Sequence, residues 1–119
     1  MSKVVYISNL NKLHDYSSAE HFGTMTTVTA GNFPVFKTGR LIEEIVGSLI
    51  ESSQDDYLLV SGSSIIAALS MAVWLTMHEK VNILLFDRTE DMYTVRTVER
   101  KEIGLEIERT IDRRAGAEA

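Results

Sequence analysis

Residues 65–79 are expected to form a helix that is apolar on almost every side. Three alanines at 67, 68 and 72 give it one small face, and no stripe of polar residues lies opposite. The larger apolar side chains are Ile66, Leu69, Met71, Val73, Trp74, Leu75 and Met77. Such a helix must be covered on more than one side. Because the segment is shorter than the roughly 20 residues that cross a bilayer, we expect a sheet or a partner chain to cover it.

Strands are expected on both sides of this helix. Residues 57–60 are apolar on both faces, which is typical of a strand in the middle of a parallel sheet, and residues 81–86 form the next strand. A second helix runs from Thr38 to about residue 51. Its apolar face is expected to comprise Leu41, Ile42, Ile45, Val46, Leu49 and Ile50, and its polar face Glu43, Glu44, Ser48 and Glu51.

Three further strands complete the sheet. The β-branched segment 24–29 and the short apolar segment 4–8 are expected strands, separated by one helical turn at 19–22. Residues 92–99 alternate in polarity like an edge strand, and the five-residue connection before them predicts a hairpin.

The fold class is therefore α/β: two or three layers, two main helices, and a mostly parallel sheet of about five strands with an antiparallel edge strand. Residues 1–99 are expected to form one domain, followed by a charged segment, 100–119. Within that segment we predict a helix over 106–114, although the alternation of Ile103, Leu105 and Ile107 also fits a strand. Residues 115–119 are expected to be frayed or disordered.

Charge and composition exclude several classes of function. The 12 basic and 17 acidic residues give a net charge of -5, so we do not expect nucleic-acid binding. The chain has no cysteine, which excludes disulfide scaffolds, zinc ribbons and thiol catalysis and fits a reducing compartment. The amino-terminal segment lacks the apolar run of a signal peptide, and we expect a cytoplasmic protein that does not enter a membrane.

The candidate site follows from the sheet. In parallel sheets of this kind, ligands bind outside the carboxyl ends of the strands, near the point where the strand order reverses. The loops that leave those ends are polar, and the residues around His14 are close enough in sequence to form a wall. The candidate ligand-binding residues are Asn9, His14, Asp15, Ser61, Gly62, Ser63, Ser64, Asp87 and Arg88.

The turn at 61–64 has two interpretations. Gly62 permits a tight turn, so the unpaired N–H groups of the following helix are suited to hold a phosphate, a carboxylate or a nucleotide. In the other interpretation, Ser63 or Ser64 simply caps the helix. The segment lacks the complete motifs of phosphate-binding loops and the Gly-x-Ser-x-Gly of a nucleophile elbow, and we expect no ester or peptide hydrolysis.

The cluster of His14, Asp15 and Tyr16 is also open to two interpretations. These side chains can perform acid–base chemistry or orient a ligand. Alternatively, His14 is solvated, Asp15 begins the short helical turn and Tyr16 packs into the core. The sequence predicts no metal site and no cofactor, because the histidines lack metal-ligand spacing, and Asp87–Arg88 is expected to be a loop ion pair.

Several segments resemble one family. The run 14–23, the following Thr29-Ala30-Gly31 and residues 56–62 are similar to small α/β proteins found in bacteriophages and phage-derived regions. The resemblance spans about residues 4–98. It implies a short viral accessory protein that binds a host component or a small signalling molecule, and it assigns no catalytic residue.

Two functions therefore stay open. The first is a non-catalytic binding protein that acts on a host component as a homodimer, with an interface on the apolar helix through Met71, Trp74 and Leu75. The second is a domain, enzymatic or not, that binds a nucleotide-like or phosphorylated small molecule with the loops at the strand ends. We favour binding without catalysis, because no nucleophile and base can be paired from their spacing.

Overall fold

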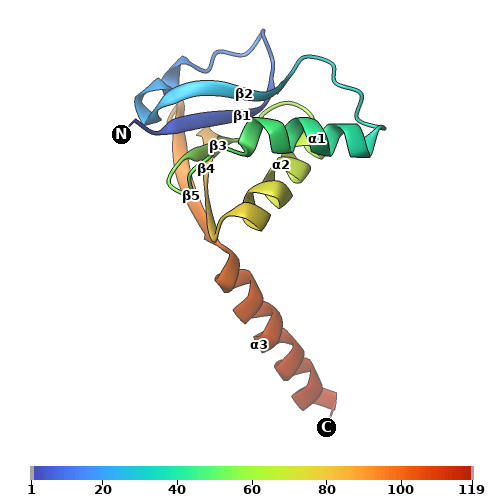
Figure 1. The fold of residues 1–119 in the computed structure, drawn as a ribbon. Coiled ribbons are helices and arrows are strands. Elements are labelled where there is room, and N and C mark those ends of the chain that lie inside the picture. Colours follow the sequence, from blue (N-terminus) through green and yellow to red (C-terminus); the bar gives the residue numbers. More distant parts are fainter. Residues whose placement is uncertain (1, 119) are drawn as a thin grey trace.

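The computed structural model describes residues 2–118, which form a five-stranded mixed sheet with the strand order β2-β1-β3-β4-β5 (Figure 1). The elements in chain order are β1 (Val4–Leu10), the 3-10 helix η1 (Ser17–Phe22), β2 (Thr24–Ala30), α1 (Thr38–Leu49), β3 (Tyr57–Leu59), α2 (Ser64–Met77), β4 (Lys80–Asp87), β5 (Met92–Glu99) and α3 (Arg100–Glu118). The first four strands of the order are parallel, and β5 pairs antiparallel with β4. The predicted α/β class with an antiparallel edge strand is confirmed.

The boundaries differ from the prediction in two places that matter for the site. β1 continues to Leu10, so Asn9 is a strand residue paired with Thr29 and not a loop residue. α3 spans Arg100–Glu118, twice the length expected from 106–114, and the strand alternative for this segment is wrong. The structure therefore has three main helices in place of two.

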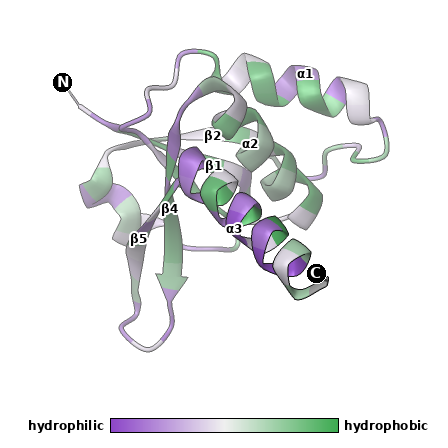
Figure 2. Cartoon of the chain, turned by 90° about the horizontal axis from the view of Figure 1, so that it is seen from below, coloured by the Kyte–Doolittle hydropathy of each residue, from purple (hydrophilic) through white to green (hydrophobic). Residues whose placement is uncertain are grey.

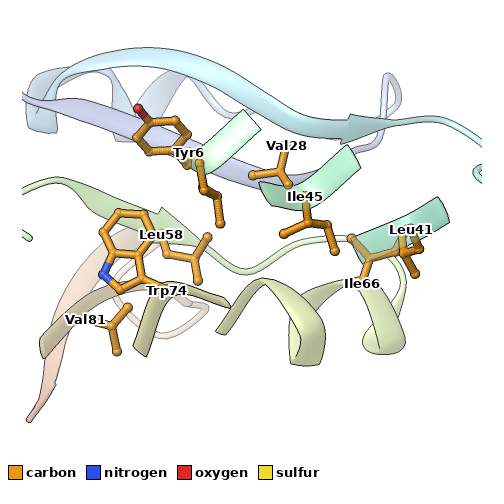
Figure 3. Close-up of a cluster of buried hydrophobic side chains, with 9 residues drawn as sticks. Tyr6, Val28, Leu41, Ile45, Leu58, Ile66, Trp74 and Val81 are labelled. Carbon is orange, nitrogen blue, oxygen red and sulfur yellow. The ribbon is translucent and has the colours of Figure 1, made fainter. Parts of the chain in front are cut away.

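The two faces of the sheet are covered unequally. Helices α1 and α2 pack on one face, and the short η1 lies on the other (Figure 1). Because side chains alternate along a strand, Tyr6 of β1 points to the helical face while Val5 and Ile7 point to the face of η1. Figure 3 shows the helical-face core, in which Leu58, Trp74 and Val81 lie near Tyr6.

Helix α2 buries one stripe, formed by Ile66, Ser70 and Trp74, against this core. Trp74 is fully buried, and its indole N–H donates to the carbonyl of Lys80 (3.0 Å). This corrects the expectation that Trp74 lies in a subunit interface, since the core of its own chain buries the whole side chain. Met71 and Leu75 are half-buried against the same core, whereas Ile65 remains 43% exposed.

Helix α3 leaves the domain directly after β5 and projects away from it (Figure 1), so that the chain extends 55 Å along its longest axis. Its first residue is fixed by two hydrogen bonds. The Arg100 N–H donates to the carbonyl of Glu79 (2.8 Å), and the Arg100 guanidinium donates to the carbonyl of Leu75 (3.0 Å). Beyond this root, the residues of α3 up to Ala117 are exposed apart from the half-buried Thr110.

Candidate functional site

The carboxyl ends of β1, β3 and β4 meet at one edge of the sheet because the three strands are parallel. The strand order reverses between β1 and β3, since β2 lies on one side of β1 and β3 and β4 lie on the other. We call the junction of Ser8, Asn9, Ser61 and Gly62 at this edge the switch point. A ligand of an open α/β sheet is expected to bind in a crevice at such a place.

In this protein the switch point is closed by two serines. The buried Ser8 hydroxyl donates to the carbonyl of Ser61 (2.8 Å) and accepts the Ser61 N–H (2.9 Å). The Ser61 hydroxyl in turn bonds to the phenol of Tyr16 (2.7 Å). Both hydroxyls are therefore used within the chain.

Gly62 lies in close contact with the side chain of Asn9. Its φ of +75° lies in the left-handed region, and a Cβ added there would lie 2.7 Å from the Asn9 Cβ. The carboxamide of Asn9 donates to the carbonyl of Gly31 (3.3 Å), which holds that side chain in place. The Asn9 side chain therefore packs against Gly62 on the side where a Cβ would stand.

The two serines that follow do not cap α2 with their hydroxyls. Ser63 occupies the N-cap position without a side-chain hydrogen bond to the helix, although its carbonyl accepts the Ala67 N–H (3.0 Å). Ser64 is the first helical residue and is exposed. The capping role expected of a hydroxyl at 63 or 64 is therefore not formed among the residues that the structure describes.

Tyr16 links the first loop to the switch point. Its side chain is buried in the core on the η1 face, and its hydroxyl accepts the Asn11 N–H (3.0 Å) as well as bonding to Ser61. This agrees with the interpretation of Tyr16 as a core residue. The bond to Ser61 could not be predicted from local spacing, since 45 positions separate the two residues.

His14 lies on the surface beside this network. Its Nε2 bonds to the phenol of Tyr93 (2.8 Å), and its ring contacts those of Tyr16 and Phe86 edge-on. Burial raises the pKa of the Tyr93 hydroxyl, and the neighbouring Tyr16 and Asp15 raise it further. The phenol therefore stays protonated and remains able to donate to the imidazole.

A shallow groove of about 380 Å³ runs past His14. Asp15 stands in it with a lowered pKa, chiefly because its carboxylate accepts the Ser17 N–H (2.9 Å). The residues that line the groove are Leu13, His14, Asp15, Ser17, Ser18, Phe86 and Asp91. The groove thus carries two carboxylates, which repel a phosphate.

Asp87 and Arg88 do not join the switch point through any bond between the described side chains. The Asp87 carboxylate accepts the N–H groups of Thr89 (2.9 Å) and Glu90 (3.3 Å), which fixes the turn of the β4–β5 hairpin. Arg88 is exposed at that turn. The expected ion pair between them is absent from residues 2–118.

One serine–histidine pair exists elsewhere. The Ser52 hydroxyl lies 2.8 Å from His78 Nε2, but it donates its own proton to the carbonyl of Leu49 (2.6 Å). The imidazole must therefore donate to Ser52, and the pair closes the end of α1 instead of activating a nucleophile. Within the described residues, no cluster of three metal-ligating side chains occurs, and no helix is long and apolar enough to span a bilayer.

A stripe of exposed apolar residues lies on α3. Ile103, Ile107 and Ile111 are spaced four residues apart and are 45%, 54% and 61% exposed, so they form a stripe along one side of the helix. Figure 2 shows the resulting alternation of hydrophobic and hydrophilic residues along α3. The sequence indicated this stripe through the same spacing, but it gave no sign that the helix would project without a cover.

These features define a class: a small α/β protein whose polar residues at the strand ends bond to one another and whose last helix projects from the domain (Figure 1). The chain belongs to the Phage Pam3 gp32-like family, whose model matches residues 3–100, and is a phage protein. The match ends at the first residue of α3. No curated protein and no solved structure matches the chain.

Proposed function

We propose that this phage protein is a non-catalytic interaction protein that acts as a homodimer on a protein component of the host cytoplasm. The observation that carries the proposal is a contrast between two surfaces. At the switch point, Ser8 bonds to Ser61, which bonds in turn to Tyr16, and Asn9 packs closely against Gly62. In contrast, α3 presents three isoleucines to solvent.

The chemistry of the hydroxyls supports a role without catalysis. A serine nucleophile needs a base that accepts its proton. The Ser61 hydroxyl is bonded to Tyr16, and the Ser52 hydroxyl donates to a backbone carbonyl even though a histidine lies beside it.

Exposed apolar side chains support a role in association. A large apolar residue that stays in solvent loses the free energy that burial provides, about 1.5–3 kcal/mol for a complete isoleucine side chain. Three such residues on one side of a projecting helix are typical of a surface that another protein covers. The absence of cysteine from the sequence fits action in a reducing cytoplasm.

The second candidate function is binding of a nucleotide-like or phosphorylated small molecule, and the groove beside His14 is the observation that favours it. The groove offers an imidazole and an aromatic ring, which suit a base or sugar. Its two carboxylates, Asp15 and Asp91, disfavour the phosphate. We therefore rank this function second.

Native mass spectrometry of the freshly purified full chain separates the two candidates. We expect a mass of twice 13.3 kDa with no retained small molecule. A stoichiometric small-molecule adduct would favour the second candidate, and a persistent monomer would contradict the homodimer.

The host component requires its own test. We expect the immobilised wild-type chain to retain one host protein from a lysate, and the purified host protein to bind again at a fixed stoichiometry. If no retained protein binds again after purification, the host-directed part of the proposal is wrong.

A further inference from the structure

We draw no further inference here: the strongest candidate, the exposed stripe of Ile103, Ile107 and Ile111 along the projecting helix α3, carries nothing beyond the proposed function, because nothing in the structure shows what covers it.

Discussion

Substitution of Gly62 by alanine tests the closed switch point directly. Two separate effects oppose the new methyl group. The first is the backbone, because a φ of +75° is unfavourable for any residue with a Cβ, at about 1–2 kcal/mol. The second is the Asn9 side chain, whose Cβ would lie 2.7 Å from the new atom. Relief of such an overlap in a packed region typically costs a further 1–3 kcal/mol.

Gly31 provides the matched control. Its φ of +63° is similar, but a Cβ there has nothing within 4 Å. We therefore expect Gly31→Ala to lower the free energy of unfolding by about 1 kcal/mol and Gly62→Ala to lower it by about 3 kcal/mol. The difference of about 2 kcal/mol measures the contact with Asn9.

Urea unfolding measures both values through the fluorescence of Trp74, the single tryptophan, which is fully buried in the folded chain. The free energy of unfolding is expected to fall by about 1.5 kcal/mol per M of urea. The urea concentration at half-unfolding of Gly62→Ala should then lie about 1.3 M below that of Gly31→Ala. Addition of Asn9→Gly should make the loss in the double variant smaller than the sum of the two single losses. Equal midpoints for the two alanine variants would refute the closed switch point.

Three further predictions concern single side chains. Ser70→Ala should raise the free energy of unfolding by about 1 kcal/mol in urea, because the buried Ser70 hydroxyl has no partner within residues 2–118; a loss would contradict this. Asp56→Ala should lower it by about 2 kcal/mol, since the Asp56 carboxylate accepts the N–H groups of Val4 (2.9 Å) and Ser53 (2.8 Å); an unchanged midpoint would show that water replaces these bonds. The pKa of Tyr93 is raised in the folded chain, so this residue contributes stability that is present below pH 10.0 and is lost as the pH rises through the folded pKa. Above pH 10.0 the urea midpoint should therefore fall less steeply with pH in Tyr93→Phe than in the wild type. An equal fall of the midpoint in both proteins would contradict this.

The architecture was predictable because the helical and strand periodicities are strong. Within the predicted apolar face of α1, Leu41, Ile45 and Leu49 are fully buried, whereas Ile42 and Val46 are more than a third exposed. The apolar segment that contains Leu58 and Leu59 is the central strand β3. The connection predicted at residues 87–91 does form an antiparallel hairpin, in which four residues separate β4 from β5.

The details of the candidate site were not predictable, because they depend on contacts between distant residues. The sequence shows that Gly62 permits a tight turn, but the residue opposite its missing Cβ is Asn9, 53 positions earlier. The same is true of Ser8, whose hydroxyl bonds to the backbone of Ser61. Spacing alone cannot distinguish polar residues that bind a ligand from polar residues that satisfy one another.

The burial of Trp74 shows how one residue of a predicted interface can be placed wrongly although the reasoning behind it is sound. An apolar helix does need a cover, and α1 and the sheet bury the stripe that contains Trp74. Apolar surface in need of a cover was expected on α2, but it also occurs on α3, where Ile107 and Ile111 are more than half exposed. The structure leaves α3 uncovered because β5 ends at the base of the sheet and Arg100 fixes the helix there, directed away from both layers (Figure 1).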